Sequence, residues 1–140
     1  MIEFEGTIWK SKRSRYWVAY IEGLDLSTQG TSRRNALAMV KDAIESMAQC
    51  KGFRVTVSPG ARGTFSVGAN HSKLWIGFLF QQLRVKAGLT IEQVAHRMGS
   101  SSKTAYARYE QGKVMPSLKK FADILAILTP RHRTILRLAA

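Results

Sequence analysis

The stretch "GLTIEQVAHRMGSSSKTAYARYEQGK", Gly88 to Lys113, decides the fold of the second half of the chain. Thr90 precedes apolar residues that recur every three or four positions, which predicts a short helix with Thr90 as its N-cap. Gly99 ends that helix, because glycine tolerates the positive φ of a sharp turn. Beyond three serines, the spacing of Tyr106 and Tyr109 predicts a second helix. Two short helices joined by such a turn are the arrangement of a helix-turn-helix.

Helical periodicity continues on both sides of this stretch. Apolar residues at three- and four-residue spacing predict one helix from Leu74 that Gly88 ends, and another that begins at Pro116-Ser117. Pro130 is expected to begin a last helix. We therefore predict an all-α domain of about five helices over residues 74–140.

The outward face of the second helix of the motif supplies the candidate DNA contacts. Tyr106 and Tyr109 mark its buried side, so the residues opposite them are expected to face solvent. Those side chains are short, polar or basic, and they can hydrogen-bond to base edges or phosphates. The candidate DNA-binding residues are Ser101, Ser102, Lys103, Thr104, Arg108, Lys113 and Gln93. A helix that spans roughly Ser101 to Glu110 would enter the major groove, and a homodimer is expected on a palindromic site.

The first part of the chain shows strand patterns around a single helix. Apolar and polar residues alternate from Ile2 to Trp9, and Tyr16 to Glu22 is rich in aromatic and β-branched residues, so a hairpin is predicted. A short third strand ends at Gly30, a helix of about 17 residues follows, and two further short strands come after it. These elements predict a first domain over residues 1–68 and a linker over 69–73.

The charge of the chain favours an anionic partner. The net charge is +13; residues 1–70 hold 10 basic against 6 acidic residues, and residues 71–140 hold 12 against 3. A domain that basic usually binds a polyanion.

One cysteine, Cys50, excludes an internal disulfide framework and a thiolate zinc site. The acidic start and an apolar run limited to Leu74–Phe80 are unlike a signal peptide or membrane span, so a cytoplasmic protein is expected.

A family resemblance extends the motif. Leu79 to Leu128 resembles the Cro/CI-like (XRE) helix-turn-helix of phage repressors, through L-R-x-x-x-G-L-T, then x-E-Q-V-A, then Y-E-Q-G-K-x-x-P-S-L. The resemblance implies an internal, structural ion pair between Arg84 and Glu110. Two departures are present: Ile91 stands where the family often has Gln, and the turn is one residue longer. The register of the base-contacting residues therefore stays open by one position.

A second resemblance covers the first domain. Tyr16 to Met47 is similar to the HicB antitoxins, with a strand, a loop ending in Gln-Gly and a capped helix opening with Ala-Leu. It implies a type II toxin–antitoxin role: an α+β N-terminal domain (partial ribonuclease-H-like, HicB type) binds a small HicA-like, mRNA-cleaving toxin, and the all-α domain represses the shared operon. It assigns no toxin-binding residue. Arg33 and Arg34 stand where the family usually has acids; either they meet an anionic partner or an exposed helix turn tolerates them.

Two other functions were weighed. A stand-alone helix-turn-helix repressor, whose first domain senses a ligand or dimerises, is the alternative. An enzyme is not expected, because Glu3 and Glu5 share a strand face that is otherwise solvated and no His or Ser is placed for nucleophilic work. The histidines, His71, His96 and His132, have no convincing carboxylate partner. No cofactor and no metal are implied.

Overall fold

The computed structural model describes residues 2–100, 102–133 and 135. The chain divides into two compact units, Met1–Trp75 and Ile76–Ala140, which we call the sheet unit and the helical unit. Helix α2 (Ser72–Lys86) begins in the first unit and continues into the second. The predicted linker, 69–73, therefore covers the end of a strand and the start of α2.

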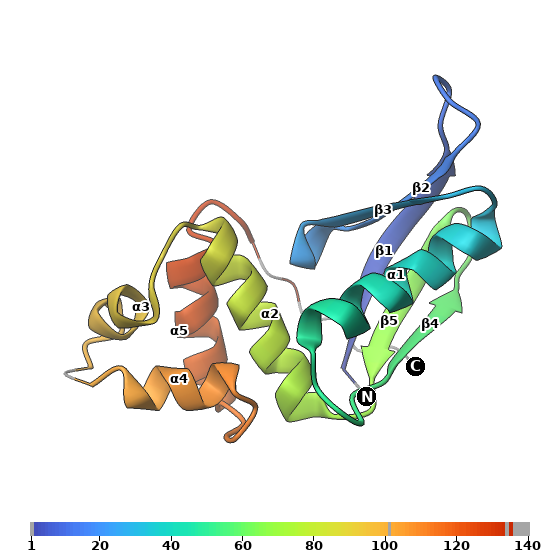
Figure 1. Ribbon diagram of the computed structural model, residues 1–140. Helices are drawn as coiled ribbons and strands as arrows, with labels where there is room; N and C mark the ends of the chain where they lie inside the picture. The colour runs from blue at the N-terminus through green and yellow to red at the C-terminus, as the bar shows by residue number, and fades with distance from the viewer. Residues whose placement is uncertain (1, 101, 134, 136–140) are drawn as a thin grey trace. The chain divides into compact units, whose positions relative to one another are not determined.

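Five strands and one α-helix form most of the sheet unit (Figure 1). The elements are β1 (Glu3–Lys10), β2 (Trp17–Ile21), the 3-10 helix η1 (Glu22–Leu24), β3 (Leu26–Gly30), α1 (Arg33–Ala48), β4 (Val55–Pro59) and β5 (Thr64–Ala69). The strands pair antiparallel throughout, in the order β3-β2-β1-β5-β4, so β3 and β4 are the edges.

One face of the sheet and one side of α1 make the core of this unit. Cross-strand partners lie on the same face, as Ile8 opposite Ala19 and Phe4 opposite Val67 do. The buried residues of this layer are Ile8, Ala19, Ile21, Val55, Phe65 and Val67 from the strands and Ala36, Leu37, Val40 and Ile44 from α1. On the opposite face of β1, Glu3, Glu5 and Trp9 are exposed. The alternation of β1 thus separates a core face from a solvent face.

Local capping fixes the ends of α1. The Ser32 hydroxyl accepts a hydrogen bond from the Asn35 amide at 3.0 Å, so Ser32 is the N-cap. The helix ends at Ala48 because Gln49 adopts a left-handed conformation with φ of 47°. The helix has 16 residues, close to the 17 predicted, and Met47 near its end is exposed.

The helical unit contains most of α2 and three shorter helices. These are α3 (Ile91–Arg97), α4 (Thr104–Glu110) and α5 (Leu118–Leu128). Their apolar sides meet in one core around Phe80, whose ring centroid lies 6.4 Å from that of Tyr106 and 5.7 Å from that of Phe121. The buried residues include Phe78, Leu79, Phe80, Val94, Ala95, Tyr106, Ile124, Leu125 and Leu128.

The predicted fold class is wrong and is corrected by this architecture. In place of a partial ribonuclease-H-like α+β domain followed by about five helices, the chain has an N-terminal five-stranded, wholly antiparallel sheet and then helices. The physical reason lies in strand pairing. β5 pairs with β1, more than fifty residues earlier in the chain, and thereby separates β1 from β4.

No helix begins at Pro130 within the described residues, and most of the predicted last helix lies outside them.

None of the helices within the described ranges combines the length and apolarity that crossing a bilayer requires.

Candidate nucleic-acid interface

Helix α4 has one buried side and one exposed side. Tyr106 is fully buried against Phe80, and this contact turns the other side of the seven-residue helix outward. Thr104 and Arg108, one turn apart, are exposed there, and Ala105 is exposed at the start of the helix. Within the described part of the chain, no acid pairs with Arg108. The helix therefore presents a guanidinium, a hydroxyl and a methyl group on one surface.

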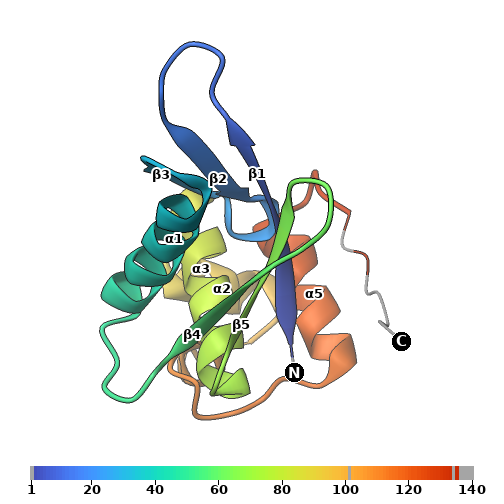
Figure 2. The ribbon, with the colours of Figure 1, turned by 90° about the vertical axis from the view of Figure 1, so that its right-hand side faces the viewer.

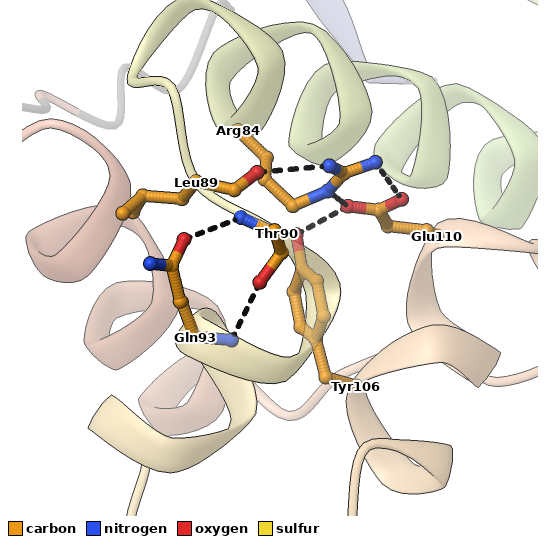
Figure 3. A network of polar contacts seen from close by, with 6 residues as sticks. All are labelled: Arg84, Leu89, Thr90, Gln93, Tyr106 and Glu110. Atoms are coloured by element: carbon orange, nitrogen blue, oxygen red, sulfur yellow. Dashed lines mark hydrogen bonds and ion pairs between the residues drawn. The ribbon is translucent and has the colours of Figure 1, made fainter.

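A buried polar network fixes α4 to α2 (Figure 3). The Arg84 guanidinium donates from Nε to Glu110 Oε1 at 2.5 Å and from Nη2 to Oε2 at 3.1 Å. The Tyr106 hydroxyl also donates to Glu110 Oε1, at 2.6 Å. Arg84 Nη1 donates to the Leu89 carbonyl at 3.0 Å, so the same guanidinium also braces the connection from α2 to α3. The structure thus brings together the two residues for which the sequence resemblance implies an ion pair.

The network raises the pKa values of Arg84 and Tyr106. The hydrogen bond to Glu110 raises the pKa of Arg84, which stays charged. Burial, reinforced by the hydrogen bond to Glu110, raises the pKa of the Tyr106 hydroxyl well above its ordinary value. The tyrosine therefore remains a proton donor to the carboxylate, and Glu110 accepts from both neighbours.

Gly77 lets α2 approach the end of α4. A Cβ atom built at Gly77 would lie 2.4 Å from the Glu110 carbonyl oxygen and 2.8 Å from that of Tyr109. Both neighbours are backbone atoms, which cannot rotate away. The close approach of the two helices therefore depends on the missing side chain at Gly77.

We expect Gly77→Ala to lower the free energy of unfolding of the helical unit by about 1–3 kcal/mol, as overpacked sites do. This is opposite in sign to helix propensity, which favours alanine over glycine by about 1 kcal/mol in a helix. Hydrogen exchange of the α2 and α4 amides measures the effect. Gly23→Ala is the control, because nothing lies within 4 Å of a Cβ at Gly23. Unchanged or slower exchange in Gly77→Ala would contradict the close packing.

A capping box begins α3. The Thr90 hydroxyl accepts from the Gln93 amide at 3.1 Å, and Gln93 Oε1 accepts from the Thr90 amide at 2.8 Å (Figure 3). Gln93 was predicted to bind DNA. Its carbonyl oxygen is used by the cap, which fixes the side chain and leaves its amide nitrogen as the group able to donate to a phosphate.

The turn between α3 and α4 is built from glycine and serine. Gly99 has φ of 79°, and its amide donates to the His96 carbonyl at 2.9 Å. The Ser100 hydroxyl donates to the Ser102 carbonyl at 2.8 Å, and the Ser102 hydroxyl accepts from the Thr104 amide at 3.2 Å. α4 consequently begins at Thr104 rather than near Ser101. The predicted contact Ser101 lies outside the described residues.

The predicted basic contacts have different surroundings. Lys103 Nζ lies 3.3 Å from Glu92 Oε1 on α3, and both side chains are exposed. Such a surface pair contributes about 0–1 kcal/mol, so a phosphate group can compete with Glu92 for the lysine. Lys113 is exposed after α4, and its amide donates to the Arg108 carbonyl at 3.0 Å. Arg108 lies on the exposed side of α4.

Sequence reasoning missed two exposed positions on this surface. Ala105 is exposed at the start of α4, and Gln111 follows the end of the helix. The periodicity set by the tyrosines does not point to Ala105, because Ala105 precedes Tyr109 by four residues and so shares its side of the helix. An alanine methyl can contact the methyl group of thymine, and a glutamine can bond adenine in the major groove.

The comparisons with known proteins bear on this part of the chain. Residues 80–129 match the helix-turn-helix family. These residues contain the end of α2, all of α3, α4 and α5, and the buried network. The helix-turn-helix is a DNA-binding regulatory domain, and the match supports the Cro/CI-like resemblance. It gives no support to the HicB resemblance. The comparison with curated proteins found no match.

The candidate catalytic side chains considered from the sequence are all exposed. Glu3 and Glu5 are exposed on β1, and His71, His96 and His132 are exposed at scattered positions in the chain. Over residues 2–100, 102–133 and 135, no three His, Cys, Asp or Glu side chains gather as metal ligands.

Proposed function

We propose that the chain is a sequence-specific DNA-binding regulator that places α4 in the major groove of its operator. The observation that carries this proposal is the division of α4 into two sides. Tyr106 and Glu110 anchor its inner side, and Thr104, Ala105 and Arg108 form an exposed surface of groove-compatible chemistry.

The position of each predicted contact residue suggests whether it binds a base or a phosphate. Arg108, with two parallel N–H donors, suits a guanine, and Thr104 suits either a base or a phosphate. Ser102, Lys103, Lys113 and the Gln93 amide border this surface and suit phosphates. Ser101 belongs to the same proposed set by its place in the sequence. A homodimer that spans two half-sites about 34 Å apart would double every contact.

We further propose that the regulator is an antitoxin whose sheet unit binds a HicA-like, mRNA-cleaving toxin. What supports this is the similarity of residues 16–47 to HicB antitoxins, together with an open groove of about 570 Å³ between α1 and the edge strand β4. Leu37, Val55 and Val57 give the groove an apolar floor, and its charged lining residues are Arg33, Arg34 and Lys41. An acidic surface segment of the toxin fits this combination of charge and apolar area.

Local contacts shape the edge of this groove. Arg33 Nη2 donates to the Gly60 carbonyl at 3.4 Å, which ties the start of α1 to the turn after β4. Glu45 Oε1 accepts from the Val55 amide at 2.8 Å, so one N–H on the outer edge of β4 is already bonded. Pro59 removes another donor from that edge. Side chains, rather than an added strand, would therefore carry most of the binding.

One experiment tests both levels of the proposal. The chain is expressed with its neighbouring small reading frame in cells that carry a reporter fused to the DNA upstream of the operon. We expect reporter repression, growth rescue and copurification of the two proteins. Arg34→Glu with Lys41→Glu should abolish rescue and copurification and leave repression intact. The matched control is Lys51→Glu with Arg62→Glu, two exposed cations outside the groove.

Growth rescue and copurification test the antitoxin role, and reporter repression tests DNA regulation. A harmless neighbour, or no complex, would refute the antitoxin role and leave a stand-alone repressor. An unrepressed reporter that the purified chain also fails to bind would refute DNA regulation itself.

A further inference from the structure

The tip of the β1–β2 hairpin concentrates positive charge. Residues 10–15, "KSKRSR", carry Lys10, Lys12, Arg13 and Arg15, and no acid occurs between Glu5 and Glu22. All four cations are exposed. In Figures 1 and 2 the tip extends beyond the other strands and loops of the sheet unit. The charge is therefore displayed on a projection.

Hydrogen bonds give the tip a defined shape. The Ser11 amide donates to the Tyr16 carbonyl at 2.9 Å and closes the loop. The Ser11 hydroxyl accepts from the Arg13 amide at 3.2 Å, and the Ser14 hydroxyl accepts from the Tyr16 amide at 3.3 Å. The Arg15 guanidinium lies 5.7 Å from the centroid of the Tyr16 ring. The cations are thus presented by an ordered turn rather than by a loose coil.

The clustered cations of the tip repel one another, and a bound polyanion would offset this repulsion. Four like charges in six residues repel one another, and among the described residues no carboxylate forms an ion pair with any of them. Packing does not explain their presence, because all four side chains are exposed. The regular spacing of phosphates along a duplex supplies the complementary charge.

We propose that the hairpin tip binds the phosphate backbone of duplex DNA as a sequence-independent second contact beside that of α4. The proposal rests on the DNA-binding function proposed above. In this role Lys12, Arg13 and Arg15 add affinity without base preference, because phosphates carry no sequence information directly. Removing them should change the salt dependence of binding and leave discrimination between sequences intact.

The test measures binding of the full-length chain to a random-sequence duplex of about 30 base pairs across a salt series. Each phosphate contact contributes about 0.9 to the slope of log affinity against log salt concentration. Lys12→Gln, Arg13→Gln and Arg15→Gln together should reduce the slope by about 2–3 and weaken binding about 10²-fold at 0.15 M salt. The control, with the same change in net charge, is Lys51→Gln, Arg62→Gln and Lys73→Gln, three exposed cations outside the tip.

Every outcome decides the question. An unchanged slope in the hairpin variant, or an equal loss in the control, would overturn the proposal and leave DNA binding by α4 in place. A change seen with single-stranded RNA of equal length, but not with the duplex, would overturn it in favour of an RNA contact. If the unmodified chain binds neither this duplex nor the DNA upstream of its operon, the DNA-binding function itself fails.

Discussion

Replacing Glu110 by alanine is expected to lower the free energy of unfolding of the helical unit by about 3–5 kcal/mol. The side chain of Glu110 is 7% exposed and that of Arg84 is 15% exposed, so the substitution leaves a buried guanidinium without its counter-charge. It also deprives the Tyr106 hydroxyl of its acceptor. Hydrogen exchange of the α2 and α4 amides is the direct measurement. Hydrogen exchange of the β1 and β2 amides, which lie in the sheet unit, provides the internal control.

Two further variants separate charge from packing. Tyr106→Phe removes one hydrogen bond and keeps the ring, so a loss of about 1 kcal/mol is expected. Arg84→Met combined with Glu110→Met replaces the pair by apolar side chains of similar length, and most of the lost stability should return. If Glu110→Ala unfolds no more easily than Tyr106→Phe, the carboxylate is not the anchor of α4.

Arg108→Ala is expected to remove most of the preference for the operator over random DNA. A bidentate arginine–guanine contact is worth about 1–3 kcal/mol, and a dimer makes it in both half-sites, so discrimination should fall by about 2–6 kcal/mol. Stability should change little, because Arg108 is exposed and has no ion-pair partner among the described residues. Competition binding with the upstream DNA and a random duplex at one salt concentration measures the ratio.

Lys119→Ala is the comparison for Arg108→Ala. The Lys119 side chain is 88% exposed on α5, and its Nζ lies 3.2 Å from Asp123 Oδ2. Lys119→Ala should weaken binding to both DNAs equally and reduce only the salt dependence. Equal losses on specific and random DNA for Arg108→Ala would assign that residue to the backbone instead of the bases.

The signals that sequence analysis used well were local. Thr90 is the N-cap of α3, as its place before the apolar residues indicated, and Gly99 adopts the positive φ that its place in the turn suggested. The outward side of α4 follows from Tyr106 in the same way. Ala105 was overlooked because its methyl group carries no polar signature.

The errors arose where distant residues decide. The antiparallel insertion of β5 between β1 and β4 depends on pairing Gly6 with Phe65, a contact that no local pattern encodes. Lys103 remains a predicted DNA contact, and its position 3.3 Å from Glu92 on the preceding helix is likewise a feature that no local pattern encodes. Each of these outcomes required the three-dimensional arrangement.

The separation of α4 into an anchored side and an exposed side has an evolutionary consequence. Thr104, Ala105 and Arg108 touch little of the domain that supports them, whereas Tyr106 and Glu110 carry its attachment. Mutations at the exposed positions are therefore nearly free of a folding penalty. After gene duplication, two copies can diverge to different operators at these positions and cease to cross-regulate, while both retain the same scaffold.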